Sequence, residues 1–431
     1  MKVAFYTLGC KVNTYESEAL QNLFEADGFS IVNYKEYSDV YVINTCTVTN
    51  QSDSKSRKSI RQAIKRNPDA IVAVIGCYSQ VANEEVSRIE GVDIIMGTAR
   101  RERLLELVKQ YMRERSQINS VQDISKYKTF DELNVTSFSE NTRAFIKIQD
   151  GCNQYCSYCI IPFARGPIRS RDKDEIIREA RSLIASGYQE IVLTGIHTGG
   201  YGSDLKDISF YDLLKALSEL EGLKRLRISS IEINQLTEEI LDLLENYPVF
   251  ASHLHIPIQS GSDEILSKMR RRYDLNTYLS KITEIKRRMP NIAITTDVIV
   301  GYPEETDAHF EEIKNTLKTI GFSELHVFPY SKRSGTKAAI VKDHVHGTIK
   351  SMRVNALILL NEQLANQYID KVKTDAQNVL FERCDGQYCY GHTSNYLFVK
   401  VATKENLINT MHNVIIKTAS YPESIAEFIK Q

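Results

Sequence analysis

The sequence predicts an α/β protein with an N-terminal open parallel α/β domain, a central partial (βα)6 barrel and a small C-terminal antiparallel β-barrel. Short β-branched runs alternate with amphipathic helical stretches over residues 1–115 and again over residues 139–367, as in parallel sheets covered by helices. Residues 116–138 are polar and lack a sustained period, which indicates a linker with room for one short strand. Residues 368–431 change to short alternating runs, which favour antiparallel strands.

Length and composition describe an ordinary globular protein. The chain has 431 residues, 42% hydrophobic and 25% charged, and this size predicts roughly two to four domains. A formal net charge of -1 excludes a globally basic nucleic-acid binder but allows local basic surfaces. No apolar run approaches about 18 residues, and the first residues read as a strand, so we expect a soluble cytoplasmic protein without a membrane partner.

Three predicted strands of the N-terminal part end beside cysteines. Strands are expected at residues 2–6, 40–43 and 70–75, and helices at 17–26, 55–65 and 101–113. Cys10, Cys46 and Cys77 each follow one strand. Because the carboxyl ends of parallel strands meet at one edge of a sheet, we expect these thiols to form one cluster site. Gly9 and Gly76 suit a backbone that crowds a cluster; the alternative is that three small cysteines merely pack.

A second set of cysteines opens the central part. Cys152, Cys156 and Cys159 have CxxxCxxC spacing in a loop that follows the strand-like run 144–148. Three thiolates at this spacing can hold three irons of a [4Fe-4S] cluster and leave the fourth iron open. The alternative is a zinc site, which needs four ligands, and no fourth Cys or His lies beside these three.

The central part is expected to form a barrel that is open on one side. Strands near 143–148, 190–193, 225–228, 253–256, 293–300 and 324–328 alternate with helices such as 174–186. Functional loops of such a fold lie at the carboxyl ends of the strands. The loop residues that we expect to bind a cofactor through hydrogen bonds or ring packing are Tyr158, Thr194, Ser230, Glu232 and Gln259. For Tyr158 simple core burial is the alternative.

Basic residues gather locally despite the neutral total. Arg165, Arg169 and Arg171 follow the second cysteine set, and another group stripes the helix near 55–66. The densest run ends in Arg270, Arg271 and Arg272, directly before an aromatic residue. These three arginines are candidates for binding RNA phosphates and a splayed base, and the alternative is an ordinary solvated face.

The C-terminal part is expected to be a small barrel with strands at 376–382, 388–393, 397–401 and 413–418. Cys384 and Cys389 lie five residues apart in it without a third partner. In a reducing compartment they are predicted to be structural thiols, with a metal role as the alternative.

Several motifs resemble the radical S-adenosylmethionine (SAM) methylthiotransferases. The cysteine loop with Tyr158 before its last cysteine resembles the radical SAM superfamily. Thr-Leu-Gly-Cys-Lys-Val-Asn at 7–13, Asn-Thr-Cys-Thr-Val-Thr at 44–49 and Ile-Gly-Cys-Tyr at 75–78 resemble the N-terminal domain of the methylthiotransferases. Gly-His-Thr-Ser-Asn-Tyr at 391–396 resembles the TRAM domain, an RNA-binding module. The resemblance covers nearly the whole chain.

The resemblance implies two [4Fe-4S] clusters and SAM as cofactors. An auxiliary cluster on Cys10, Cys46 and Cys77 carries the sulfur, and SAM binds the open iron of a radical cluster on the other three cysteines. One SAM methylates a sulfur on the auxiliary cluster, and a second is cleaved to a deoxyadenosyl radical. Gly-Cys-Lys-Val-Asn is similar to the branch that acts on N6-threonylcarbamoyladenosine in tRNA, at C2 of the base beside the anticodon.

The chemistry of the substrate agrees with this expectation. Carbon 2 of adenine is electron-poor and has no acidic proton, so a radical must remove its hydrogen. The expected partners are the tRNA anticodon stem-loop, an electron donor such as flavodoxin or ferredoxin, and a sulfur source. Three alternatives stay open: methylthiolation of isopentenyladenosine in tRNA, methylthiolation of a ribosomal protein, and a non-catalytic Fe-S protein that binds RNA.

Overall fold

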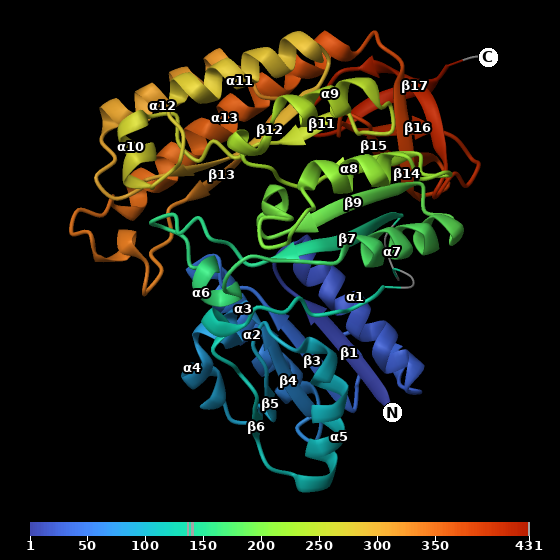
Figure 1. The fold of residues 1–431 in the computed structure, drawn as a ribbon, viewed down its shortest axis with the longest axis vertical. Helices are drawn as coiled ribbons and strands as arrows, with labels where there is room; N and C mark the ends of the chain where they lie inside the picture. Colours follow the sequence, from blue (N-terminus) through green and yellow to red (C-terminus); the bar gives the residue numbers. More distant parts are fainter. Residues whose placement is uncertain (136–137, 139–141, 430–431) are drawn as a thin grey trace.

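The computed structural model describes residues 1–135, 138 and 142–429, and it has the three expected parts (Figure 1). The N-terminal domain lies below the central domain in this view, and the C-terminal barrel lies beside the central strands. The described part contains no helix that is both long and apolar enough to span a membrane. Short 3-10 helices occur at Arg101–Arg103, Ile124–Lys126, Thr198–Gly200, Ile233–Gln235 and Lys337–Ile340.

The N-terminal domain is a six-stranded parallel sheet with the order β2-β1-β3-β4-β5-β6. Its strands are β1 Lys2–Thr7, β2 Ser30–Val32, β3 Val40–Thr45, β4 Ile71–Gly76, β5 Ile94–Ile95 and β6 Ile118–Asn119. Its helices are α1 Lys11–Ala26, α2 Asn50–Arg66, α3 Cys77–Val81, α4 Asn83–Ser87 and α5 Leu104–Glu114. Every residue of β3 and β4 is buried, because helices cover both faces of a parallel sheet.

Two boundaries of this domain differ from those expected. The polar linker contributes β6, which pairs with β5, so the sheet continues past residue 115. Helix α1 begins at Lys11, six residues before its predicted start. Its first turns bury the polar residues Asn13 and Glu16, and an apolar period cannot reveal a helix face that buries polar groups.

The central domain has six parallel strands arranged in sequence order. They are β7 Arg143–Asp150, β9 Glu190–Gly195, β10 Arg225–Ile228, β11 His253–His255, β12 Ala293–Val300 and β13 Glu324–Pro329, with β8 Arg169–Ser170 antiparallel beside β7. A single bridge between Leu226 and Phe250 joins the β7 to β10 sheet to the segment before β11. The expected partial barrel is therefore confirmed, and β13 is its open edge.

Helices surround the outside of this sheet (Figure 1). They are α7 Lys173–Ala185, α8 Phe210–Ser218, α9 Glu238–Asn246, α10 Asp263–Lys268, α11 Leu275–Arg288, α12 Asp307–Ile320 and α13 Gly347–Val372, whereas the short α6 Ile161–Arg165 lies against α3 of the N-terminal domain. Side chains such as Ile176, Leu213 and Ile282 pack against strand residues such as Ile146 and Ile294 in one core. Helix α13 runs through the domain boundary expected at 367/368, and the C-terminal strands begin only after it.

The C-terminal domain is a closed five-stranded barrel with the order β14-β15-β16-β18-β17. Its strands are β14 Gln377–Cys384, β15 Tyr388–Thr393, β16 Phe398–Ala402, β17 Met411–Thr418 and β18 Ser424–Phe428. Four of them were predicted. The missed strand, β18, pairs with β16 and β17 and closes the barrel, and its Ala426 lies in the barrel core.

This barrel is seated on the amino-terminal ends of the central strands through Tyr396. The Tyr396 ring stacks on His253, with centroids 4.9 Å apart, and lies under the guanidinium groups of Arg227 and Arg143, at 4.7 and 5.4 Å. Arg225 donates to the Asn378 side chain at 2.7 Å. These central residues lie at the starts of their strands, so the barrel covers the end of the central domain opposite the cysteine loop.

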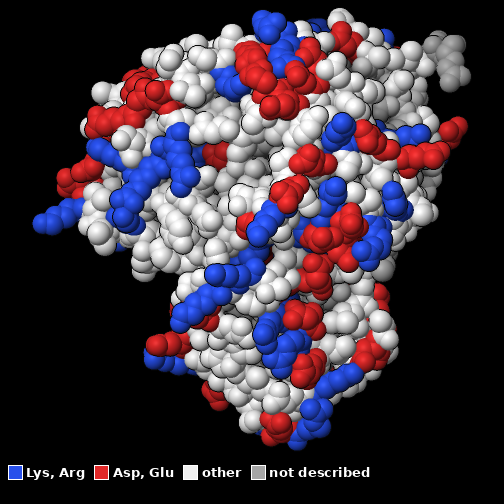
Figure 2. Space-filling model, viewed as in Figure 1, with Lys and Arg blue, Asp and Glu red and all other residues white. Residues whose placement is uncertain are grey.

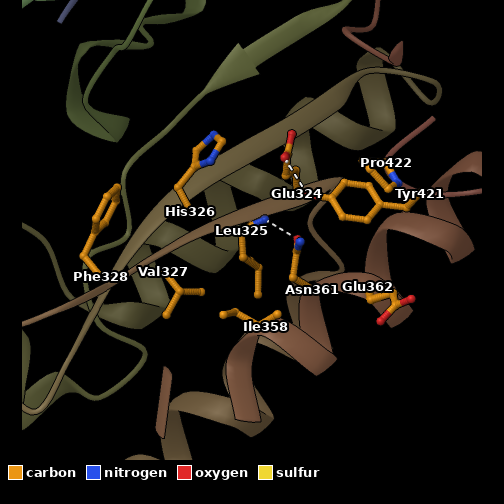
Figure 3. Close-up of a pocket in the computed structure, with 10 residues that line it drawn as sticks. All are labelled: Glu324, Leu325, His326, Val327, Phe328, Ile358, Asn361, Glu362, Tyr421 and Pro422. Carbon is orange, nitrogen blue, oxygen red and sulfur yellow. Dashed lines mark hydrogen bonds between the residues drawn. The ribbon is translucent and has the colours of Figure 1, made fainter. Parts of the chain in front are cut away.

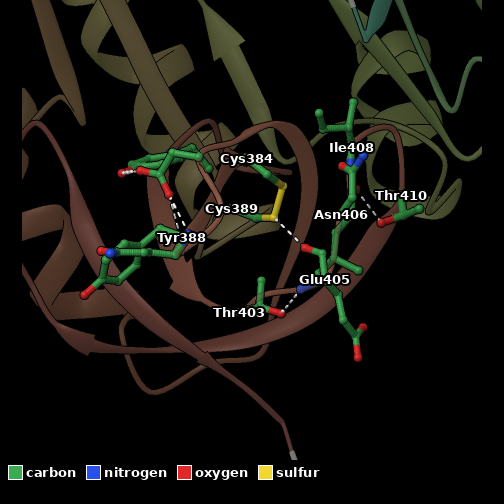
Figure 4. Close-up of a disulfide and its surroundings, with 12 residues drawn as sticks. Cys384, Tyr388, Cys389, Thr403, Glu405, Asn406, Ile408 and Thr410 are labelled. Atoms are coloured by element: carbon green, nitrogen blue, oxygen red, sulfur yellow. Dashed lines mark hydrogen bonds between the residues drawn. A yellow bond between two sulfur atoms is a disulfide. The ribbon is translucent and has the colours of Figure 1, made fainter.

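Cys384 and Cys389 form a disulfide in the structure, so the prediction that they are thiols is wrong (Figure 4). They lie five residues apart along the chain, but they are direct partners in the β14–β15 hairpin, with Cα atoms 4.1 Å apart. Reasoning from sequence separation missed that a hairpin turn brings them face to face.

A groove of about 460 Å³ lies between β13, α13 and the segment before β18 (Figure 3). Leu325 donates its backbone N–H to Asn361 at 2.7 Å, and the Tyr421 hydroxyl donates to Glu324 at 2.9 Å. The groove lies along β13, the open edge of the central sheet. None of the residues that line it was expected to bind a cofactor or RNA.

Candidate active site

The three cysteines of the N-terminal domain lie together at one edge of its sheet. Cys10 caps α1 after β1, Cys46 follows β3, and Cys77 begins α3 after β4, and these three strands are neighbours. Their thiols interact electrostatically with one another. Burial raises the pKa of Cys46 and raises that of Cys77 to about 11, so binding of a metal cluster there would release protons.

Two glycines keep space open beside these cysteines. Gly9 has φ +116°, and a Cβ on it would lie 3.0 Å from the Cβ of Cys46. Gly76 has φ +102°, and its Cβ would lie 2.6 Å from Asn44 Oδ1. Both residues thus have a backbone conformation and a close neighbour that only glycine tolerates, as expected for a crowded cluster cradle.

The second cysteine set lies in the loop after β7. Gly151, with φ +74°, precedes Cys152, and a Cβ there would lie 1.9 Å from the Pro167 carbonyl oxygen. The backbone N–H of Cys152 donates to Gly166 at 3.0 Å, and that of Cys159 donates to Cys156 at 3.0 Å. Burial raises the pKa of Cys152 to about 11 and that of Cys159 to about 12. A loop this compact, with three thiols that interact with one another, fits a three-cysteine cluster site.

Arg271 lies inside this site and not on the surface. Its side chain is only 4% exposed, it pairs with Glu232, and its Nη1 lies 3.6 Å from Cys156 Sγ. Arg270 has φ +60°, and this turn directs the next side chain inward. The structure therefore does not support Arg271 as a phosphate-docking residue. Glu232, which was expected to bind a cofactor, pairs with Arg271. Arg270 and Arg272 are exposed, and Figure 2 shows basic side chains gathered beside α10.

The other residues expected to bind a cofactor follow central strands. Thr194 is buried near the end of β9, Ser230 follows β10, and Gln259 lies between β11 and β12 with φ +63°. Tyr158 packs with Met269 and other apolar residues, which agrees with the core-burial alternative. Their contact with a cofactor stays a prediction.

Sequence reasoning missed His197. Its Nε2 lies 2.6 Å from the Gln235 amide nitrogen and 3.4 Å from that of Gln154. Burial, together with Arg271 and Arg272, lowers the pKa of His197 to about 4, so the ring is neutral at physiological pH. A small cavity of about 30 Å³ lies beside it and is lined by Gln154, Cys156, Glu232, Asn234, Gln235, Arg270, Arg271, Arg272 and Tyr273. The only feature of the sequence that could have indicated a role for His197 is its position two residues after Gly195, at a strand end.

A buried ionic network lies between the two cysteine sets. Arg165, which follows the second set, is fully buried, and its Nε donates to Cys77 Sγ at 3.3 Å. The same guanidinium donates to Asp150 at 3.1 Å, directly before Gly151. Arg169 and Arg171 are buried as well, so none of these three arginines lies on a basic surface. Arg165 thus connects the two cysteine sites physically.

A partial parallel barrel with a three-cysteine loop at a strand end defines a radical SAM protein. Residues 146–317 match the radical SAM superfamily, and residues 2–97 match uncharacterized protein family UPF0004. The radical S-adenosylmethionine methyltransferase TsrM of Kitasatospora setae has a similar fold, with a TM-score of 0.60 at 16% identity over 79% of this chain and 77% of that chain.

Sequence relatives identify the family more closely. Threonylcarbamoyladenosine tRNA methylthiotransferase MtaB of Bacillus subtilis is 47% identical over 99% of this chain and 96% of the relative. MtaB of Aquifex aeolicus is 39% identical over 86% of this chain and 91% of that relative. The tRNA-2-methylthio-N(6)-dimethylallyladenosine synthase of Hydrogenobaculum sp. is 30% identical over 98% of each chain. The chain belongs to the radical SAM tRNA methylthiotransferases, so the expected family and enzyme class are confirmed.

We expect the double variant Arg270→Ala, Arg272→Ala to bind tRNA more weakly than the parent. If both arginines contact phosphates, the salt slope of binding falls by about two units, about one for each contact. Filter-binding or fluorescence titrations at several salt concentrations measure both quantities. The control is Arg178→Ala, Arg181→Ala, which removes the same charge from exposed positions of α7. Equal slopes in the parent and the first variant would mean that Arg270 and Arg272 are an ordinary solvated face.

Proposed function

We propose that the protein inserts a methylthio group at C2 of N6-threonylcarbamoyladenosine at position 37 of tRNA, beside the anticodon. The observation that carries this proposal is the contact of one buried side chain, Arg165, with both cysteine sites, at Cys77 and through Asp150. Two [4Fe-4S] sites placed side by side suit a reaction that needs both a radical and a sulfur donor. The Bacillus subtilis relative carries the same activity in its name.

The placement of three cysteines at neighbouring strand ends and of three in one compact loop supports the assignment of two clusters. Cys10, Cys46 and Cys77 would hold the auxiliary cluster, and Cys152, Cys156 and Cys159 the radical cluster. When bound, the radical cluster and SAM supply the chemistry that removes hydrogen from an unactivated carbon. The chain itself shapes the site. Arg271 and Glu232 form an ion pair beside Cys156, and the neutral His197 ring lies nearby with its Nε2 in contact with Gln235.

The substrate proposal also has support from Lys11, one residue after Cys10. Burial lowers the pKa of Lys11, whose ammonium is attracted by Tyr396 and repelled by Arg143 and Arg227 of the central domain. Arg227 alternates with the core residues Leu226 and Ile228, which places it on the inner face of β10. Glu190 attracts Lys11, but this carboxylate already pairs with Arg225 at 2.9 Å and with Arg227 at 2.6 Å.

A half-buried cation whose attracting carboxylate is already shared by two arginines suits an anionic ligand. The threonylcarbamoyl group ends in a carboxylate, whereas the isopentenyl group is apolar. We infer that Lys11 binds the carboxylate of the threonylcarbamoyl group. A ribosomal protein substrate and a non-catalytic role have no such support, and the isopentenyladenosine reaction remains the competing outcome because the Hydrogenobaculum relative bears that name.

The decisive test of the substrate is nucleoside mass analysis of tRNA from a strain that lacks the protein. We expect 2-methylthio-N6-threonylcarbamoyladenosine to disappear and its unthiolated precursor to accumulate. The parent gene should restore the product, and the variant with Cys10→Ala should not. Loss of the methylthiolated isopentenyladenosine instead would overturn the proposal.

The variant Lys11→Gln should lose activity on the threonylcarbamoyladenosine substrate. A hydrogen bond to a charged group contributes about 1.5–3 kcal/mol, so kcat/KM should fall about 10- to 150-fold. The assay is methylthiolation of tRNA in vitro, with Lys35→Gln, an exposed lysine after β2, as control. SAM cleavage without tRNA should be unchanged. An unaltered kcat/KM in Lys11→Gln would show that the carboxylate is bound elsewhere.

The partners of this reaction are tRNA, an electron donor such as flavodoxin or ferredoxin, and a sulfur source, in the cytoplasm. The C-terminal barrel is proposed to dock tRNA as a TRAM-like domain, with Arg270 and Arg272 at the edge of the active site. An unpaired anticodon-loop base can enter such a site at low unstacking cost.

A further inference from the structure

The network between the cysteine sites consists of charged side chains that are removed from water. Its cations are Arg101, Lys147, Arg165 and Arg169, its carboxylates are Glu16 and Asp150, and none of the six side chains is more than 3% exposed. Lys147 lies 2.7 Å from both carboxylates, and Arg101 lies 3.0 Å from Glu16. Within the network four cations face two carboxylates, and a buried excess of positive charge is costly unless an anion completes it.

Arg165 places part of this positive charge next to the N-terminal cysteines. Its Nε donates to Cys77 Sγ at 3.3 Å, and its Nη2 donates to Asn13 Oδ1 at 2.6 Å. The same Asn13 oxygen lies 3.9 Å from Cys10 Sγ. Glu16 holds the guanidinium from the other side, at 2.9 and 3.1 Å. The arginine is therefore fixed by its partners with one N–H aimed at a sulfur.

Asp150 connects the same guanidinium to the second cysteine loop. Arg165 Nη1 lies 3.1 Å from both Asp150 oxygens, and Asp150 Oδ1 accepts the backbone N–H of Gly151 at 2.8 Å. Cys152 follows Gly151 directly. Arg165 thus fixes the position of one cysteine loop relative to the other.

We propose that Arg165 is a positioning residue that raises the reduction potential of the cluster held by Cys10, Cys46 and Cys77, through its hydrogen bond to Cys77 and its buried charge. The proposal rests on the proposed function, which places a cluster there. Reduction adds negative charge to a cluster, and hydrogen bonds to its sulfurs together with a nearby cation stabilise that charge. Burial strengthens the effect because the surroundings screen it poorly.

Lysine cannot replace this arginine. A guanidinium has five N–H donors in a fixed plane, and Arg165 uses them on Cys77, Asn13, Glu16 and Asp150 together. An ammonium keeps the charge but not this fork geometry. Arg165→Lys therefore keeps the positive charge and removes the hydrogen bond to Cys77.

The test uses protein in which Cys152, Cys156 and Cys159 are alanine, so that only the auxiliary cluster is present. Anaerobic redox titration followed by electron paramagnetic resonance measures its potential. We expect Arg165→Lys to weaken electron binding at least tenfold, a shift of 59 mV to more negative potential for one electron. The control is Arg171→Lys, a buried arginine that pairs with Glu179 away from the cysteines, and it should leave the potential unchanged.

Asp150→Asn is a second variant, for which the expected shift of the potential has the opposite sign. It removes a negative charge from the network at nearly constant shape, so the potential should rise. An unchanged potential in Arg165→Lys that retains its iron overturns the proposal. If Arg165→Lys loses the cluster, the potential of Asp150→Asn becomes the test. A potential that does not rise in Asp150→Asn overturns the proposal. Absence of iron from the background protein itself would instead refute the auxiliary cluster of the proposed function.

Discussion

Protein with Cys152, Cys156 and Cys159 changed to alanine is expected to retain about four irons per chain after anaerobic reconstitution, against about eight in the parent. It should also lose reductive cleavage of SAM completely. The reason is that the loop after β7 is the only three-cysteine loop at a central strand end among the described residues, so no other loop of the central domain can hold the cluster that cleaves SAM. Iron analysis and the yield of deoxyadenosine measure the two effects.

The matched control replaces Cys384 and Cys389, which lie in the C-terminal barrel and should affect neither quantity. Melting curves establish that each variant is folded. Full iron content in the triple variant would refute the assignment of a cluster to this loop.

Replacing Cys10, Cys46 and Cys77 with alanine should separate the two half-reactions. SAM cleavage should persist, because it needs only the central cysteine loop, while methylthiolated tRNA falls below detection. The two sets lie on different domains, and buried side chains such as Arg165 connect them. Deoxyadenosine and modified nucleoside are quantified in the same reaction.

The control for this prediction is spectroscopic, since the radical cluster must be present before SAM cleavage is measured. Loss of both deoxyadenosine and product in protein with about four irons would mean that SAM cleavage depends on the auxiliary site. The proposed division of labour would then be abandoned.

The sequence predicted the strands and the grouping of the cysteines well, because both depend on local patterns. β10 and β12 have the predicted bounds, and Cys10, Cys46 and Cys77 meet at one sheet edge because neighbouring parallel strands end together. Hydrophobic runs and strand ends are properties of short segments, so a single sequence reveals them.

Contacts between distant segments could not be predicted in this way. Arg165 looks like a surface cation until α1 supplies Glu16 and the strand before the loop supplies Asp150. Arg271 reads as one of three equal arginines until the left-handed turn at Arg270 directs it toward Cys156. The disulfide between Cys384 and Cys389 depends on the register of a hairpin. Each depends on tertiary placement that local patterns do not contain.

The seat of Tyr396 on the central strands has a mechanical consequence for RNA recognition. A module joined by a flexible linker would search for its ligand independently of the catalytic domain. Here stacking on His253 and the cover of Arg143 and Arg227 fix the small barrel to the strand ends. If RNA docks on that barrel as proposed, it is presented at a distance set by the length of the central strands. Such a fixed barrel would select a nucleotide by its separation from the docking point as well as by its chemistry.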